Sequence, residues 1–489
     1  MSDTFTDFLK RGIGPRQGMQ RIPFPTESYQ HPSKPLSAKR LLNLYSETEP
    51  SDARSQAALI STPGLVFREN LNGGPVVQFN TELLGGFYAV SGGHAFRNIA
   101  GVTSDLGAVG TPVDPLTDPT RLMTTIACSP TDVVICVPPN AFTATHIGAL
   151  APVAGGFPGA NSVCFQDGYF VYSQTGDGTQ WFISHLDDPT LYDALDFATL
   201  EGMNNVIMRS VTHRGELWHL GYAGIEVWYD AGGLAITGTD FPFLRRSGAI
   251  IPYGVEPRSV ALKVDGSIFW VSVDGIVYRS QGYAALRVST HAIEAIIETS
   301  FPNLAVGFTY TQLGHIFYGF TLTDIGRTLV YDCATKEWAD RSSDINGNGP
   351  WRATVAGQVG PRPYIGDASG NLYAVDPDVA TDAGVLVARQ ATLPSIYNPN
   401  RQSMNRVEVE MEAGGASSPG NVLLDWSDDG GNIFRAPRVM SAGTILETKK
   451  RVFTNRLGSF RERVLRVTTH GKTTLYAVDA DITNPLAGG

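Results

Sequence analysis

The sequence predicts an all-β protein: an irregular β-propeller of six or seven blades, followed by a small C-terminal β-sandwich or barrel. Three observations lead to this fold class. Apolar runs are joined by Asp-Gly pairs, the pattern recurs every 40–50 residues, and its character changes after residue 395. The 53 glycines and 30 prolines suit a chain of many turns rather than many helices.

The clearest unit spans residues 257–289. Three runs of β-branched and aromatic residues are joined there by Asp265-Gly266 and Asp274-Gly275. Asp-Gly favours a type I′ turn, because both central residues of that turn need positive φ and glycine adopts it without strain. The segment is therefore predicted to be a tight antiparallel meander, and its middle strand has apolar residues on both faces.

The same pattern recurs along the chain. Its first turns fall at residues 86, 132, 168, 215, 266, 314 and 360. Meanders at this interval are typical of propeller blades with about four strands each. We count seven units, and a weak first or last unit would reduce the count to six. The residues expected to form structural turns in the meanders are Asp167, Gly168, Asp177, Gly178, Asp265, Gly266, Asp274 and Gly275.

Three parts follow one another in the predicted chain. Residues 1–55, rich in proline and polar residues, are expected to be an extended N-terminal arm, either a loose terminus or a segment packed along the domain or a neighbouring subunit. Residues 56–395 form the propeller, in which a strand at 59–68 closes the ring. Residues 396–489 alternate polar and apolar side chains in longer strands, as in a sandwich or barrel.

Two interruptions of the propeller pattern are expected to be helical. Residues 188–201 begin with an Asp-Pro pair and are rich in acidic residues. Residues 290–299 begin at Thr290, a suitable N-cap, and place isoleucines on one face of a short amphipathic helix.

Bulk composition limits the function classes. The net charge of −10 argues against a wide basic surface that grips nucleic acid, but it is compatible with nucleic acid that slides past. No apolar run is long enough to cross a bilayer, so no membrane insertion is predicted, and the N-terminus has no signal-peptide pattern. The four cysteines lack metal-ligand spacing. We therefore expect no metal site and no cofactor.

The motifs point to structure rather than catalysis. Residues 427–434 match an Asp-box pattern, in which Asp429 and Gly431 are expected to stabilise a turn. His213 and His219 share one strand face without a third ligand, so packing is the expected role. No nucleophile or paired-acid motif is identifiable, so no catalytic residue is assigned. The alternative is a carbohydrate-binding or glycan-hydrolysing propeller, which as a hydrolase would need two carboxylates facing a cleft.

One stretch near the C-terminus is basic. Its residues could form a solvated hairpin face or a subunit or partner interface, in which arginine makes bidentate contacts. DNA contact ranks third. The candidate interface residues are Lys449, Lys450, Arg451, Arg456, Arg461 and Arg463.

Several blocks, taken in order, resemble a known family. They are STPGL at 61–65, DGYFVYS at 167–173, WFIS at 181–184, DDPTLYDALDFA at 187–198, GIEVWY at 224–229, HAIEAII at 291–297 and RLGSFRERVLRV at 456–467. The chain resembles the packaged-DNA stabilisation proteins, or tail hub (nozzle) proteins, of short-tailed double-stranded-DNA phages, the podoviruses.

This resemblance implies a structural, non-enzymatic protein of the phage tail, assembled in the host cytoplasm. In such a virion it implies a homohexamer below the portal and its adaptor, the head-to-tail connector. The ring would extend the DNA channel and help to retain and eject packaged DNA. The implied partners are the adaptor, a tail fibre or tailspike, a tail needle or plug, and double-stranded DNA that passes through the lumen without tight binding.

Overall fold

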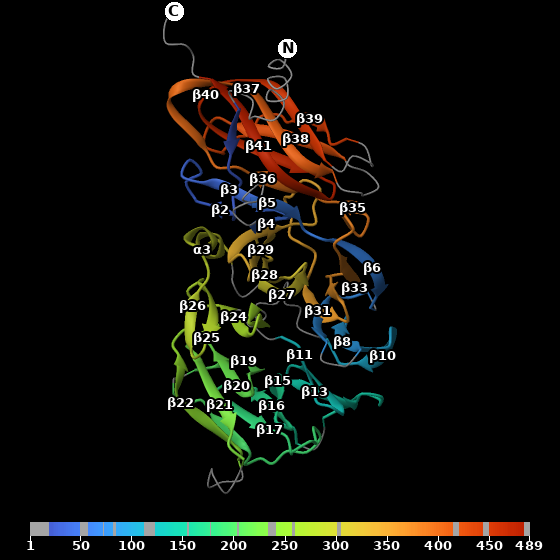
Figure 1. Ribbon diagram of the computed structural model, residues 1–489. Coiled ribbons are helices and arrows are strands. Elements are labelled where there is room, and N and C mark those ends of the chain that lie inside the picture. The colour runs from blue at the N-terminus through green and yellow to red at the C-terminus, as the bar shows by residue number, and fades with distance from the viewer. Residues whose placement is uncertain are drawn as a thin grey trace, which may run out of the picture.

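The molecule is elongated, with a β-sandwich at one end and a β-propeller at the other (Figure 1). The computed structural model describes residues 19–48, 57–71, 73–81, 85–111, 123–153, 156–176, 178–202, 205–232, 241–256, 260–300, 305–413, 420–443 and 449–483.

Six sheets of the propeller are antiparallel meanders of four consecutive strands. The first three are β7 (Val76–Asn80), β8 (Gly86–Ser91), β9 (His94–Ile99) and β10 (Val102–Ala108); β11 (Thr125–Cys128), β12 (Asp132–Val137), β13 (Asn140–Thr145) and β14 (Ala151–Pro152); and β15 (Ala160–Gln166), β16 (Tyr169–Gln174), β17 (Gln180–Ile183) and β18 (Phe197–Thr199). The next three are β19 (Ile207–His213), β20 (Glu216–Gly221), β21 (Ile225–Asp230) and β22 (Phe243–Ile251); β23 (Leu262–Val264), β24 (Ser267–Val271), β25 (Val277–Gln281) and β26 (Ala284–Arg287); and β27 (Ala305–Gln312), β28 (His315–Leu322), β29 (Arg327–Asp332) and β30 (Glu337–Arg341).

A composite sheet closes the ring. The strands β31 (Val355–Val359), β32 (Arg362–Gly366) and β33 (Asn371–Asp376) are joined by β6 (Gly64–Asn70) from the N-terminal part of the chain. The short strands β34 (Thr381–Asp382) and β35 (Val385–Leu386) extend this sheet. Residues 64–70 thus close the ring, as the sequence predicted. With the composite sheet included, the described residues contain the seven units counted from the sequence.

The propeller core lies between the sheets. Seven clusters of buried apolar side chains each combine residues of two neighbouring sheets. The cluster of Val76, Phe87 and Leu372 joins the composite sheet to the first meander, which completes the circle. Because every sheet is covered on both faces, the middle strands have apolar residues on both sides, as β24 does with five buried residues in a row.

The sandwich combines C-terminal and N-terminal strands. Its long strands are β37 (Ile396–Ala413), β40 (Lys450–Thr469) and β41 (Thr473–Thr483), with β36 (Arg389–Thr392), β38 (Asn421–Ser427) and β39 (Arg438–Ser441). The N-terminal strands are β1 (Met19–Ile22), β2 (Tyr29–Gln30), β3 (Ala38–Leu42), β4 (Leu44–Thr48) and β5 (Ala57–Ser61). β1 pairs with β41 and β3 pairs with β36, so the described part of residues 1–55 packs along the domain, and β5 also pairs with β41.

One strand connects the two parts of the molecule. β3 pairs in parallel with β30 of the propeller and antiparallel with β36 of the sandwich. A single sheet therefore continues from one part into the other. The domain boundaries expected at residues 55 and 395 stay a prediction.

The two predicted helices had different outcomes. α3 (His291–Glu298) forms as expected after Thr290, although the Thr290 side chain makes no capping hydrogen bond. The helix predicted at 188–201 was wrong: the segment consists of turns and ends in β18. Asp188 explains the difference, because its carboxylate accepts hydrogen bonds from the amide and hydroxyl of Thr190 and thereby stabilises a local turn. No helix within the described ranges is long and apolar enough to span a membrane.

The backbone of the Asp-Gly turns varies. Asp265 and Gly266 have φ of 48° and 62°, and Asp167 and Gly168 have 50° and 89°. At Asp274-Gly275 only the glycine has positive φ. This turn is not type I′, because the amide of Ser272 bonds the carbonyl of Ile276 and closes a longer loop. Gly178 has φ of 74°, and Asp177 lies outside the described residues.

Candidate functional site

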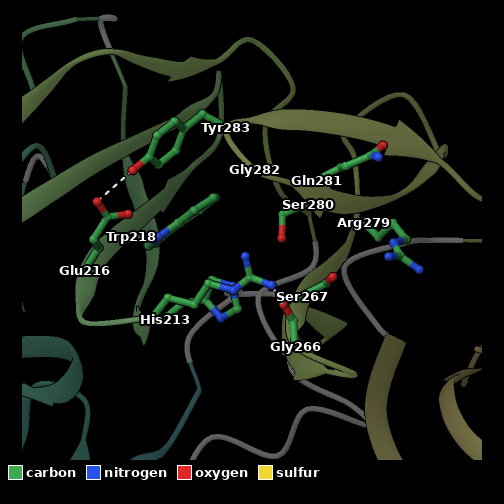
Figure 2. A pocket seen from close by; sticks show the side chains of 11 residues that line it. His213, Glu216, Trp218, Gly266, Ser267, Arg279, Ser280, Gln281, Gly282 and Tyr283 are labelled. Atoms are coloured by element: carbon green, nitrogen blue, oxygen red, sulfur yellow. Dashed lines mark hydrogen bonds between the residues drawn. The ribbon is translucent and has the colours of Figure 1, made fainter.

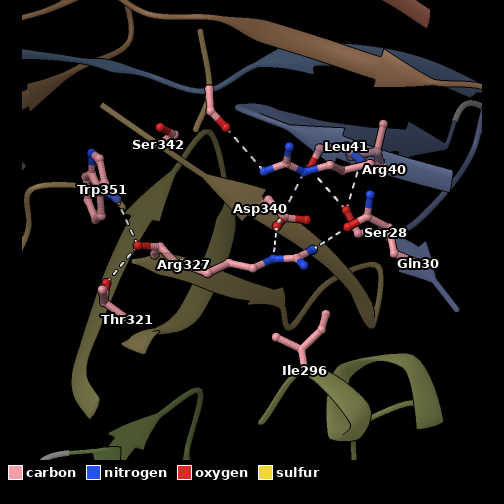
Figure 3. A network of polar contacts seen from close by, with 12 residues as sticks. Ser28, Gln30, Arg40, Leu41, Ile296, Thr321, Arg327, Asp340, Ser342 and Trp351 are labelled. Atoms are coloured by element: carbon pink, nitrogen blue, oxygen red, sulfur yellow. Dashed lines mark hydrogen bonds and ion pairs between the residues drawn. The ribbon is translucent and has the colours of Figure 1, made fainter. Parts of the chain in front are cut away.

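A polar network lies where the propeller meets the sandwich, and we call this region the junction: β3, β4, the adjoining ends of β28, β29 and β30, and the segment around β36. Figure 3 shows the Asp340 carboxylate between the guanidinium groups of Arg40 and Arg327. The Nε atom of Arg327 lies 2.7 Å, and that of Arg40 3.6 Å, from Oδ1 of Asp340. Arg327 also donates to the side chain of Gln30.

The charge at Asp340 depends on these two arginines. Its side chain is 1% exposed, and burial alone would raise its pKa. The positive charges of Arg327 and Arg40 outweigh burial and hold the pKa of Asp340 below its usual value. Since the three side chains come from β3, β29 and β30, the ion cluster ties the N-terminal strand to the propeller.

Asn43 joins three segments through one amide group. The residue is buried and has a φ of 52°, a conformation that asparagine tolerates better than most residues. Its Nδ2 donates to the carbonyls of Ser342 and Ala388 at 2.8 and 2.7 Å, and its Oδ1 accepts from the amide of Ser342. Both donors and the acceptor are used, so the turn after β3 is fixed to the propeller end and to the segment that leads into β36.

Arg389 also joins several segments of the chain, through its buried guanidinium group. Its guanidinium donates to the carbonyl oxygens of the nearby Ala380 and Val387 and of the distant Thr62 and His470. Burial lowers the pKa of Arg389 to about 10, so it remains charged at neutral pH. The charge-assisted hydrogen bonds of one side chain therefore join the closing segment of the propeller to the sandwich.

His315 on β28 connects the propeller to β4. Its Nδ1 lies 2.7 Å from Asp332, and its Nε2 lies 2.7 Å from Glu47. Burial lowers the pKa of His315, but hydrogen bonds and charge from Asp332 and Glu47 outweigh burial and raise it above its usual value. Protonated His315 can donate to both carboxylates at once, whereas the neutral ring can donate to one only.

A surface pocket of about 360 Å³ lies between the fourth and fifth meanders. It is lined by His213, Arg214, Glu216, Trp218 and Tyr283 among others, and Figure 2 shows the Tyr283 hydroxyl directed at Glu216. That hydrogen bond is 2.7 Å long, and Glu216 also pairs with Arg246 at 2.6 Å. Among the described residues, Glu216 is the one carboxylate that lines this pocket, so they do not offer the two carboxylates that glycoside hydrolysis requires.

Both histidines considered from the sequence are packing residues. His219 is buried against Trp181, and burial lowers its pKa to about 3. Its Nδ1 hydrogen-bonds Ser210. His213 packs edge-on against Trp218. Within the described ranges, no group of three or more His, Cys, Asp or Glu side chains could hold a metal ion.

The Asp-box residues contact one another. Asp429 accepts hydrogen bonds from Ser427 and from the amides of Asn432 and Ile433, which lower the pKa of its carboxyl. Gly430 and Gly431 have φ of 73° and 95°. These hydrogen bonds of Asp429 lie within its own turn, as a turn-stabilising role requires.

Five of the six basic residues near the C-terminus are exposed or half-buried. Lys449 and Arg451 lie beside Glu410, at 3.3 and 3.6 Å, and Lys450 is half-buried. Arg456 and Arg461 are exposed.

Arg463 is different from the other five. It is buried, pairs with Asp428 at 2.7 Å and covers the rings of Phe460 and Trp426. Its guanidinium therefore holds the sandwich together and does not face a partner, which corrects its assignment to an interface.

Sequence reasoning missed the junction residues. Asp340, Asn43, Arg389 and His315 have no local motif, and Asn43 bonds residues 299 and 345 positions away. The available signal was the position of acids and arginines at the predicted ends of blade strands, where such side chains meet only after the ring has closed.

Comparisons with known proteins complete the description of the chain. A family model described as Bacteriophage P22 Gp10, beta-propeller, matches residues 20–380, and one described as Bacteriophage P22 Gp10, beta-sandwich, matches residues 388–483. A search of curated proteins finds no match.

Solved structures resemble the chain only distantly. The computationally designed Ika8 protein is 12% identical, with a TM-score of 0.38, over 69% of this chain and 100% of that one. YCF48 from Cyanidioschyzon merolae is 12% identical, with a TM-score of 0.41, over 65% and 100%. BamB from Moraxella catarrhalis is 11% identical, with a TM-score of 0.38, over 73% and 99%. Scores this low support no functional argument.

Replacement of Asp340 by asparagine tests the ion cluster. We expect Asp340→Asn to lower the free energy of unfolding by about 3 kcal/mol, because two half-buried guanidinium groups lose their partner. Urea denaturation measures the change. Asp378→Asn is the matched control. The side chain of Asp378 is 84% exposed where it pairs with Lys472, so this substitution should lower the free energy of unfolding by less than about 1 kcal/mol. Equal effects of the two substitutions would contradict a clamp at Asp340.

The pH dependence of stability tests His315. Its pKa is raised in the folded state, so its contribution is complete below the unfolded value of about 6.5 and disappears as pH rises through the folded value. Urea denaturation between about pH 6 and pH 9 should show wild-type stability falling relative to His315→Gln. His291→Gln, at an 80% exposed side chain, should retain the wild-type trend. An unchanged pH profile in His315→Gln would rule out this role.

Proposed function

Because the chain belongs to the bacteriophage P22 Gp10 family of phage DNA stabilisation proteins, we propose that it is the tail hub, or nozzle, of a short-tailed phage. The family consists of phage virion proteins and is not known as an enzyme family. The supporting observation is that a propeller model and a sandwich model of one family match in sequence order, together from residue 20 to residue 483.

In this proposal six copies form a ring below the portal and its adaptor, and the ring extends the DNA channel. The build of the chain supports a mechanical role of this kind. A closed propeller leaves only short, protected sheet edges, and the junction ties it to the sandwich through paired strands and buried polar contacts. Such a subunit can transmit force between its two ends without a hinge between them.

Retention and ejection of DNA place opposite demands on the channel, because the wall must confine the duplex without adhering to it. The net charge of −10 supports a wall of low affinity, since few phosphate contacts mean little counterion release and weak binding. We therefore propose that double-stranded DNA passes through the lumen without tight binding. Assembly takes place in the host cytoplasm, and the mature location is the virion tail.

The proposed partners are the adaptor, a tail fibre or tailspike, and a tail needle or plug. On the sandwich, Arg456 and Arg461 are the exposed members of the basic group and are proposed to contact an acidic neighbour. Lys449 and Arg451 are less suited to this role, because Glu408 and Glu410 already lie beside them. No observation favours the carbohydrate-active alternative over this assignment.

The assembled particle tests the proposed function. Light scattering of the protein in assembled tails or purified rings should give about six times the chain mass of 52.6 kDa, and negative-stain images of virions should place the ring at the tail. Removal of the protein should leave filled heads that lose their DNA. A strictly monomeric protein that is absent from virions would contradict the proposal.

A further inference from the structure

The innermost strands of the propeller have an unusual charge pattern. These are the first strands of the seven sheets (β7, β11, β15, β19, β23, β27 and β31), and six of the seven neighbouring pairs, all but β19 and β23, contact one another around the axis. None of them contains Asp or Glu, although the whole chain has 47 such residues. They do contain Arg209 and Lys263. In a protein of net charge −10, the propeller axis is therefore a cationic region.

Two cavities lie at this axis, with volumes of about 220 and 100 Å³. Arg209 lines both, as does Gln78, and Lys263 lines the larger one. No carboxylate is among the residues that line either cavity. Since the share of one water in liquid volume is about 30 Å³, the larger cavity can hold a small ion with some of its water. Lys263 is exposed to solvent, so an ion can reach this cavity.

Arg209 is a cation without a carboxylate partner among the described residues. Its Nη1 donates to the carbonyl of Ala261 at 2.6 Å, which uses one of its five N–H groups. Burial lowers the pKa of Arg209 to about 10, so the group is still charged at neutral pH. A charge partly removed from water is costly unless it is paired, and the buried Arg389 and Arg463 have several carbonyls and a carboxylate as partners, respectively.

A second observation comes from Thr124. Its side chain is 1% exposed and lines the smaller cavity beside Arg209. Its hydroxyl has no hydrogen-bond partner among the described residues. Buried hydroxyl groups are normally satisfied, so the Thr124 hydroxyl, in a residue that lines the cavity beside a cation, is a second polar group without its usual partner.

We propose that the centre of the propeller is a binding site for a small oxyanion, inorganic phosphate or a carboxylate, with Arg209 as its principal ligand. Lys263 attracts the anion in the larger cavity, and Thr124 offers a hydroxyl donor in the smaller one. Arginine suits this task because its planar fork of donors matches the oxygens of phosphate and carboxylate. The site is separate from the lumen of the proposed ring, since it lies on the axis of a single propeller.

Anion-dependent stabilisation of the full-length protein tests this site. Phosphate and acetate are titrated separately at constant ionic strength against chloride, with thermal unfolding and titration calorimetry as readouts. A ligand that binds the folded state alone raises the midpoint saturably. We expect saturation with phosphate, acetate or both, and Arg209→Gln should weaken the apparent affinity at least tenfold, because hydrogen bonds to ionised groups are strong.

Arg214→Gln is the matched control. Arg214 follows the same strand and also donates to one backbone carbonyl, that of Gly266, but it lines neither axial cavity. Its substitution should leave the anion response unchanged.

Each outcome decides between the alternatives. Saturation with phosphate alone identifies a phosphate site, and saturation with acetate as well identifies a general oxyanion site. Absence of a saturable response to either anion, or an undiminished response in Arg209→Gln, overturns the proposal. If Arg209→Gln does not fold, Lys263→Gln decides instead, because Lys263 is exposed. A weaker response in that variant supports the site, and an unchanged one overturns it.

Discussion

The structure depends on one shared strand. β3 pairs with the last meander of the propeller on one side and with the sandwich on the other, so both parts belong to a continuous sheet. Through backbone pairing alone, this connection would contain few hydrogen bonds. Asp340, Asn43 and Arg389 reinforce it with buried polar contacts, which are costly to break because each would leave a buried donor, acceptor or charge without a partner.

Through this connection, a load on the sandwich can be carried by the closed propeller. Seven apolar clusters hold neighbouring sheets together, and β6 closes the circle with a strand from far away in the sequence. A load on the sandwich therefore reaches every sheet through covalent and hydrogen-bonded paths, rather than through a flexible linker. That property fits a protein of the phage virion, where the proposed ring must resist the pressure of packed DNA while its wall binds DNA weakly.

The predictable part of the fold is the part determined by local chemistry. The turn at Asp265-Gly266 and the helix after Thr290 follow from neighbouring residues, and the spacing of such turns indicates the propeller. Local reasoning failed at 188–201, where Asp188 stabilises a turn. Sequence reasoning also missed the burial of Arg463, because Asp428 lies on another strand. The junction could not be predicted, since Asn43 and Asp340 meet their partners only after the ring closes. By contrast, the absence of acids from the innermost strands is visible in the sequence once those strands are assigned.

The central claim is that propeller and sandwich form one mechanical unit, and differential scanning calorimetry of the full chain tests it most directly. If the shared sheet couples the two parts, they unfold together in a single transition whose calorimetric enthalpy equals the van't Hoff enthalpy. Two separate transitions, each with the enthalpy expected for one part alone, would contradict the claim.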